Sequence, residues 1–187
     1  PELIYDGPFS DAKKYEWRAI EDKPTVSAEE AAKIVSEKTD ATDVELAGET
    51  DGKAALYEFS AKIGDNDAFV SVSVKGGYVV NFSVARTIGA SEIGERDAQK
   101  IATDFAAKLG YADLEPVWYN AQNGIGYVNL APRPNGVTMY PDIVKVKIAL
   151  DNAQPVGIEA GGYCSSHRDR ETAPALGEKT ARSLVSD

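Results

Sequence analysis

The chain carries the same helix-opening pattern at three places, and this repetition constrains the fold more than any other feature. The three openings read Val26-Ser27-Ala28-Glu29-Glu30-Ala31, Ile93-Gly94-Glu95-Arg96-Asp97-Ala98 and Leu176-Gly177-Glu178-Lys179-Thr180-Ala181. Self-similarity at such spacings is typical of tandem repeats, in which each repeat folds as one supersecondary unit. The sequence therefore predicts two complete repeats and the start of a third.

Each complete repeat continues from a helix into four strand-like runs. Ser27 and Glu30 have the spacing of a capping box, and Gly110 ends the second helical pattern as a C-cap. Apolar residues then alternate with polar ones, as a strand with one buried face requires. The predicted strands are residues 43–49, 54–62, 68–75 and 78–86 in the first repeat and residues 113–120, 125–131, 142–150 and 154–161 in the second.

These elements predict an α+β fold made of two tandem units, each with one helix packed on a four-stranded antiparallel meander. We divide the chain into an aromatic entry segment (1–25), repeat 1 (26–90), repeat 2 (91–163), and a linker with the first helix of an incomplete third repeat (164–187). A unit of this size is near the lower limit for a stable core, so we expect the two units to pack together. Whether the 176–187 helix docks within the chain or on another copy is left open.

Composition excludes several classes of function. A net charge of −10 makes nucleic acid a poor partner, because phosphate binding requires clustered Lys and Arg. No apolar run has the length of about 18 residues that a membrane span needs. The chain begins with Pro1 rather than Met, so we expect it to be a fragment of a longer protein. Cys164 is the only cysteine, and no intrachain disulfide can form.

The sequence contains no convincing catalytic or metal-binding set. His167 is the only histidine and lies near Cys164 in a polar stretch, residues 161–174, that we interpret as a solvated linker. Asp65 and Asp67 could form a carboxylate pair, but their position at a predicted hairpin favours local turn bonding. We therefore expect no cofactor, no metal and no enzymatic activity.

Five aromatic residues of the second repeat leave two alternatives open. Trp118, Tyr119, Tyr127, Tyr140 and Tyr163 could line a binding groove, but strand aromatics more often belong to a core or to cross-strand pairs. We favour the core.

Three features together resemble a known family. They are the segment Ile4-Tyr5-Asp6-Gly7-Pro8-Phe9-Ser10-Asp11, the tandem units that open at Val26 and Ile93, and the run Gly161-Gly162-Tyr163 before Arg168-Asp169-Arg170. The repeat resembles a PepSY domain, and nearly the whole chain resembles the C-terminal region of the YpeB family of germination proteins.

This resemblance implies a function. The family has an N-terminal membrane anchor and three PepSY units, and its members are needed for the stability and action of the SleB cortex-lytic hydrolase in spores. It implies a non-catalytic, extracytoplasmic germination factor at the spore inner membrane that binds, stabilises or localises such a hydrolase. The anchor and most of the third unit are absent from this sequence.

The entry segment is our candidate for the partner-binding site, with the residues Tyr5, Asp6, Gly7, Pro8, Phe9 and Asp11. The alternative for this segment is a structural clasp in which Tyr5 and Phe9 fill gaps beside the first unit. Two alternative functions are a protease-inhibitory module, since PepSY units occur in metallopeptidase propeptides, and a glycosidase.

Overall fold

The computed structural model describes residues 16–185 of the chain. The predicted partner-binding residues Tyr5, Asp6, Gly7, Pro8, Phe9 and Asp11 lie outside this range. The elements in chain order are η1 (Arg18–Ile20), α1 (Ala28–Thr39), β1 (Thr42–Glu49), β2 (Leu56–Ile63), β3 (Asn66–Ser73), β4 (Val79–Ala85), α2 (Glu95–Leu109), β5 (Leu114–Gln122), β6 (Ile125–Pro132), η2 (Pro134–Gly136), η3 (Tyr140–Asp142), β7 (Val144–Ala149), β8 (Pro155–Glu159), α3 (Gly161–Ser166) and α4 (Glu178–Ser183).

The two long helices begin where the sequence predicts. Ser27 Oγ accepts a hydrogen bond from the Glu30 backbone at 3.2 Å, and the Glu30 carboxylate accepts one from the Ser27 backbone at 2.7 Å, so α1 has a full capping box. Gly94 stands at the corresponding place before α2 and makes no side-chain cap. Gly110 ends α2 at a φ of 102°, a left-handed conformation that glycine adopts without strain.

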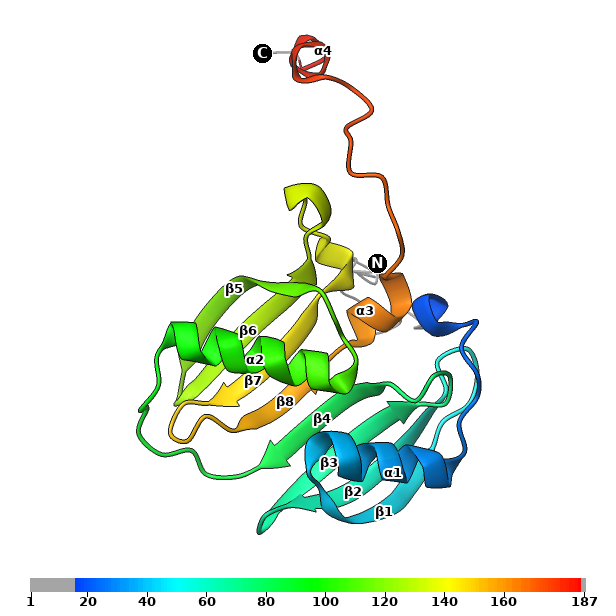
Figure 1. The fold of residues 1–187 in the computed structure, drawn as a ribbon, viewed down its shortest axis with the longest axis vertical. Helices are drawn as coiled ribbons and strands as arrows, with labels where there is room; N and C mark the ends of the chain where they lie inside the picture. Colours follow the sequence, from blue (N-terminus) through cyan, green and yellow to red (C-terminus); the bar gives the residue numbers. More distant parts are fainter. Residues whose placement is uncertain (1–15, 186–187) are drawn as a thin grey trace, which may run out of the picture.

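All eight strands form one antiparallel sheet, in the order β1-β2-β3-β4-β8-β7-β6-β5. The first four strands are neighbours in chain order, and so are the last four in reverse (Figure 1). The halves meet at β4 and β8, where Phe82 lies opposite Ile158. The predicted α+β fold with antiparallel strands is confirmed, and the two halves share a continuous sheet.

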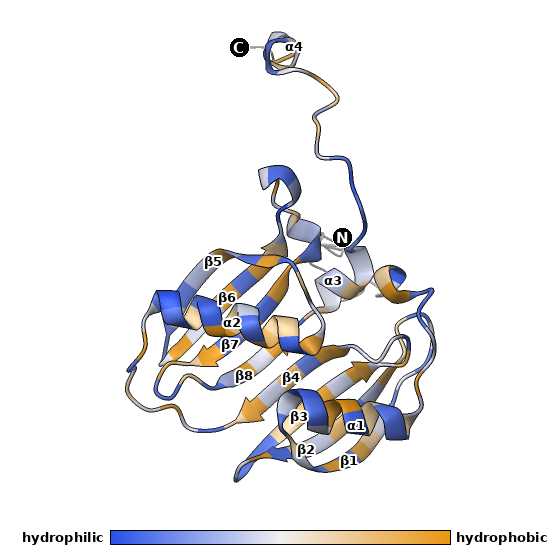
Figure 2. Cartoon of the chain, in the orientation of Figure 1, coloured by the Kyte–Doolittle hydropathy of each residue, from blue (hydrophilic) through white to orange (hydrophobic). Residues whose placement is uncertain are grey.

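The core lies between the sheet and its two helices. Figure 1 shows α1 and α2 on the same face, with α1 over the first half and α2 over the second. Figure 2 shows hydrophobic and hydrophilic residues alternating along the strands, as a sheet with one buried face requires. Val35 of α1, Ala102 of α2 and strand residues such as Val70 and Val146 are almost fully buried. Within residues 16–185, neither α1 nor α2 packs on the opposite face of the sheet, which we refer to as the uncovered face.

The segment between the halves is fastened to the β7–β8 turn. The Arg86 guanidinium pairs with the carboxylate of Asp151, which also accepts a hydrogen bond from the Gly89 backbone at 2.6 Å. The backbone N–H groups of Glu92 and Ile93 both donate to the Leu150 carbonyl. These contacts hold residues 86–93, which lead into α2, against the β7–β8 hairpin.

The structure corrects the prediction for residues 161–174. Residues 161–166 form α3, which packs against η1 and η3, and Cys164 is fully buried rather than solvated. This helix crosses the predicted boundary at residue 163. The segment is poor in helix formers, so its helix depends on packing contacts that the local sequence does not reveal.

The third helix opening is α4, a six-residue helix with Gly177 as its N-cap. Figure 1 shows α4 at the end of an extended segment and away from the sheet. None of its residues is buried. No helix within residues 16–185 has both the length and the apolar character needed to cross a bilayer.

Candidate functional site

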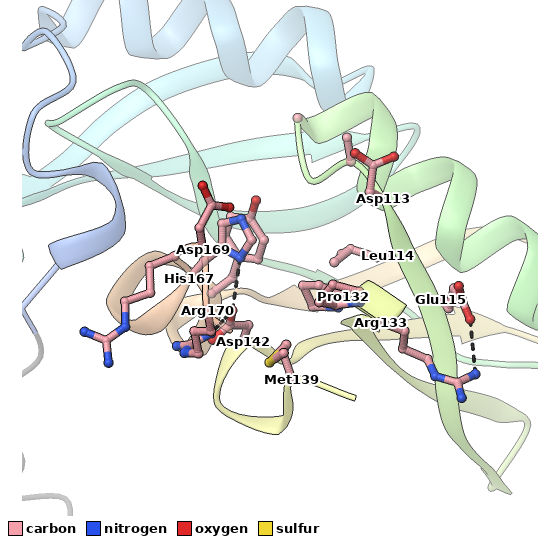
Figure 3. Close-up of a pocket in the computed structure, with 15 residues that line it drawn as sticks. Asp113, Leu114, Glu115, Pro132, Arg133, Met139, Asp142, His167, Asp169 and Arg170 are labelled. Atoms are coloured by element: carbon pink, nitrogen blue, oxygen red, sulfur yellow. Dashed lines mark hydrogen bonds and ion pairs between the residues drawn. The ribbon is translucent and has the colours of Figure 1, made fainter. Parts of the chain in front are cut away.

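A cleft of about 640 Å³ lies at one end of the second half. Its walls come from the end of α2, the β5–β6 pair, the β6–β7 connection, and α3 with the residues that follow it. Figure 3 shows Asp142, His167 and Arg170 gathered on one side of this cleft and Arg133 and Glu115 on the other. We refer to this site as the α3 cleft.

The β6–β7 connection forms one wall because its sequence favours tight turns over strand. Pro134 begins η2, and Asn135 takes a left-handed φ of 52°, which asparagine tolerates better than most residues. Pro141 lies within η3, where its fixed φ suits a helical turn. Residues 142 and 143 therefore precede β7 rather than belonging to it, in contrast to the predicted strand start at 142.

Asp142 is the buried charge that organises the cleft. Its side chain is fully buried, and Oδ2 accepts a hydrogen bond from Arg170 Nη1 at 2.7 Å and lies 3.0 Å from His167 Nδ1. This hydrogen bond raises the pKa of Arg170. Oδ1 has no hydrogen-bond partner among the described residues. Because buried carboxylates are costly unless paired, the pairing fixes the segment after α3 to η3.

An aromatic stack continues from this charge into the core. His167 lies on the Tyr163 ring with centroids 4.2 Å apart, and Tyr163 meets Tyr111 edge-on at 5.1 Å. The Tyr111 hydroxyl donates to the Val79 carbonyl at 2.9 Å and lies 3.6 Å from Cys164 Sγ. The interpretation of Cys164 and His167 as parts of a solvated linker is therefore wrong.

Burial raises the pKa of two side chains in and beside this stack. Desolvation raises the pKa of Tyr163 to about 12 and that of the Cys164 thiol to about 11. A nucleophilic cysteine requires the thiolate, which this environment disfavours. The stack is suited to packing and hydrogen bonding rather than to nucleophilic attack.

The cleft combines an apolar floor with a charged rim. Leu114 and Met139 are nearly buried apolar residues of its lining. On the rim, Arg133 pairs with Glu115 at 3.1 Å. Three further charged lining residues make no ion pair within residues 16–185, namely Asp113, Arg168 and Asp169. An apolar centre within a polar rim is the usual anatomy of a protein-binding surface.

The five aromatic residues considered for a groove do not form one site. Tyr163 lines the α3 cleft, Trp118 and Tyr127 line a separate hollow on the uncovered face of the sheet, and Tyr140 is largely exposed. Tyr119 packs against the core. The favoured core interpretation therefore holds for Tyr119 and fails for Trp118 and Tyr140.

Sequence reasoning missed Asp142 and Arg170, which lie 28 residues apart and meet only in the folded chain. Asp142 lies six residues after Gly136 in a turn-rich connection where polar residues are ordinary, so no local signal marked it. Asp67 pairs with Lys62 on an exposed hairpin, which agrees with the turn interpretation. Within the described residues, no three His, Cys, Asp or Glu side chains cluster as metal ligands would.

Comparisons with known proteins agree with the fold and identify the family. A family model described as YpeB sporulation, PepSY1 and PepSY2 domains matches residues 1–173. Proteins named sporulation protein YpeB are similar to the chain: that of Bacillus subtilis is 32% identical over 70% of the chain and 30% of its own length. The corresponding protein of Halalkalibacterium halodurans is 29% identical over 85% of the chain and 36% of its own length.

The solved Bacillus megaterium YpeB C-terminal domain has the same fold. It superposes with a TM-score of 0.72 at 21% identity, over 87% of this chain and 75% of that domain. The chain spans about a third of the length of the curated relatives it matches. The family model covers both repeats, and the chain belongs to the YpeB family of sporulation proteins.

Proposed function

We propose that this chain is the non-catalytic, partner-binding region of an extracytoplasmic spore germination factor, and that it binds and stabilises a SleB-type cortex-lytic hydrolase through the α3 cleft. Membership of the YpeB family supports the sporulation role. The observation that carries the binding proposal is the cleft itself, in which an apolar floor adjoins unpaired rim charges on a rigid frame.

The chemistry of the cleft supports binding over catalysis. The Cys164 thiol is buried, with its pKa raised by desolvation. Asp142 is engaged by Arg170 and lies beside His167, so its carboxylate serves the frame of the cleft. The exposed charges Asp113, Arg168 and Asp169 remain for a partner, and both signs are present, so they can set the register of a docked protein segment.

The test is binding of the purified chain to a SleB-type hydrolase, measured by calorimetry for wild type and charge-reversed variants. Arg168→Glu and Asp169→Lys should each weaken the complex several-fold without lowering the melting temperature, because neither side chain is paired within residues 16–185. Arg96→Glu is the matched control, since Arg96 is exposed and unpaired on α2, away from the cleft. Equal binding by all of these variants would remove the cleft from the proposal.

The same assay tests the entry segment proposed from the sequence. A double Tyr5→Ala and Phe9→Ala variant that loses hydrolase binding, while Arg168→Glu keeps it, would assign the contact to residues 5–11 instead. The alternative functions have separate readouts. Inhibition of an extracytoplasmic peptidase without hydrolase binding would favour the inhibitory module, and muropeptide release from purified cortex by the chain alone would show a glycosidase.

A further inference from the structure

The face of the sheet that the helices leave uncovered carries a second hollow, of about 380 Å³, over strands β5 to β8. Phe82 faces α2, where it contacts Phe105. Ile158 lies opposite Phe82 and Val146 lies opposite Ile158, so both share that face. Lys145 is adjacent to Val146 in β7 and therefore points to the opposite, uncovered face. The hollow is thus separate from the α3 cleft.

The hollow is built on one straight row of side chains. Trp118 lies opposite Asn129, Asn129 opposite Lys145, and Lys145 opposite Glu159. Residues directly opposite each other in a sheet project from the same face, so these four form a line across four strands. At the spacing of neighbouring strands the line is about 14 Å long. This is a shallow, elongated platform rather than a closed pocket.

The row ends in an exposed aromatic ring beside a free amide. Trp118 is 51% exposed although it lies in a strand, and Tyr127 lines the hollow beside it. The Asn129 amide makes no hydrogen bond to the described residues, so both its donor and its acceptor are available. An indole presents a flat apolar surface, and the amide adjoins it with hydrogen-bonding capacity of both kinds.

The charges of the hollow largely satisfy one another. Glu159 lies between two ammonium groups, with Lys147 Nζ at 2.9 Å and Lys145 Nζ at 3.4 Å. The aliphatic part of Lys147 crosses Gly157, where a Cβ would stand only 3.0 Å from Lys147 Cδ. The three side chains carry a net charge of one positive unit, and they still offer ammonium donors and carboxylate acceptors to a ligand.

We propose that this hollow is a binding site for an uncharged oligosaccharide. A pyranose ring has an apolar face of C–H groups that fits the Trp118 ring, and its hydroxyl groups both donate and accept hydrogen bonds. The row from Asn129 to Glu159 supplies partners for such groups in a line, which matches a linear chain of sugars. Nucleic acid would meet a single net positive charge in a chain of net charge −10.

The test uses two neutral probes, the tetrasaccharides of β-1,4-linked N-acetylglucosamine and of β-1,4-linked glucose, titrated into the intact chain. The chain has two tryptophans, and Trp118 is exposed and lines the hollow whereas Trp17 is buried and does not, so the Trp118 indole N–H signal in a ¹H–¹⁵N spectrum reports on the hollow. We expect saturable shifts of the Trp118 signal with at least one probe. A preference for the first sugar would assign the site to acetamido-sugar chains, and a preference for the second to plain glucans.

Three variants test whether sugar binding depends on the side chains of the hollow. Trp118→Ala should weaken binding about tenfold or more, because aromatic anchors dominate such contacts. Asn129→Ala should weaken it by a smaller factor. Phe69→Ala is the matched control, since Phe69 is also an exposed aromatic but lies in β3, outside the hollow. Its affinity should equal that of wild type.

The proposal is overturned if neither sugar shifts the Trp118 signal at millimolar concentration, or if Trp118→Ala binds as tightly as wild type. It is also overturned if Trp118→Ala abolishes hydrolase binding while no sugar binds, since the face would then be a protein surface. These outcomes are independent of the α3 cleft, whose test uses Arg168→Glu.

Discussion

The two halves of the sheet differ most in one connection. In the first half, β2 and β3 are joined by Gly64 and Asp65 alone, and the ion pair that residues 16–185 form beside this turn is the exposed Lys62–Asp67 contact. In the second half, residues 133–143 join β6 to β7 through η2 and η3 and deliver Asp142 to a fully buried position. The repeat thus supplies a frame, and the site lies where the second half departs from it.

The uncovered face differs between the halves in the same way. The row that ends at Trp118 in β5 continues across the first half through Asn81, Ser71 and Glu58 and ends at Gly48 in β1. Glycine has no side chain to correspond to the indole, and Glu58 Oε2 would lie 3.4 Å from a Cβ at Gly48. Both candidate sites therefore belong to the second half.

Removing the buried carboxylate should have the largest effect. Asp142→Ala removes the carboxylate that pairs with Arg170 Nη1 and leaves the Ser166 carbonyl as the remaining acceptor of this guanidinium. We expect the free energy of unfolding to fall by about 2–3 kcal/mol, because the partly buried Arg170 loses its buried counter-charge. Urea denaturation measures this loss. Asp65→Ala in the short connection of the first half is the control and should change stability by less than about 0.5 kcal/mol. Equal losses of stability in both variants would contradict the proposed difference between the two connections.

The contact between α3 and η3 is the next test. A Cβ at Gly162 would lie 3.0 Å from the Ile143 carbonyl oxygen and 3.2 Å from that of Pro141, both of them backbone atoms that cannot swing aside. We expect Gly162→Ala to lower the free energy of unfolding by about 1–2 kcal/mol, measured by thermal unfolding. The neighbouring Gly161→Ala meets only the Trp17 ring at 3.8 Å and should be tolerated. A tolerated Gly162→Ala would mean that α3 does not press against η3.

The stabilisation that comes from the contacts of Asp151 with Arg86 and Gly89 should depend on pH. The Gly89 backbone N–H and Arg86 lower the pKa of Asp151 below its ordinary value of 3.8. A lowered folded-state pKa stabilises the protein above the unfolded value, and this stabilisation is lost as pH falls through the folded value. Asp151→Ala should therefore destabilise the protein at pH 7, and its difference from wild type should shrink below pH 3.8. A difference that grows in acid would contradict this account.

The helix openings give the smallest expected effects. Ser27→Ala removes the capping box of α1 and should cost about 1 kcal/mol in urea denaturation. Gly94→Ser adds a cap that α2 lacks, with no atom within 4 Å of the new Cβ, and should gain a few tenths of a kcal/mol. A loss of stability in Ser27→Ala together with a gain in Gly94→Ser would support the equivalence of the two helix starts.

Local sequence patterns predicted the frame but not the site. The strands and helix starts follow from alternation, turn residues and caps, which act over a few neighbouring residues. The run Gly161-Gly162-Tyr163-Cys164 has poor helix propensity, and it becomes helical because Cys164 is buried and Gly162 allows close approach to η3. The pairing of β4 with β8 and of Asp142 with Arg170 likewise joins distant segments, which no local pattern encodes.

Hydrogen–deuterium exchange of the chain with and without a SleB-type hydrolase tests the central claim most directly. The account predicts added protection in three segments that line the α3 cleft, residues 110–115, 132–142 and 163–170. The β2–β3 turn of the first half should exchange at the same rate in both samples. Protection confined to the first half or to residues 1–15, with the cleft segments unchanged, would contradict it.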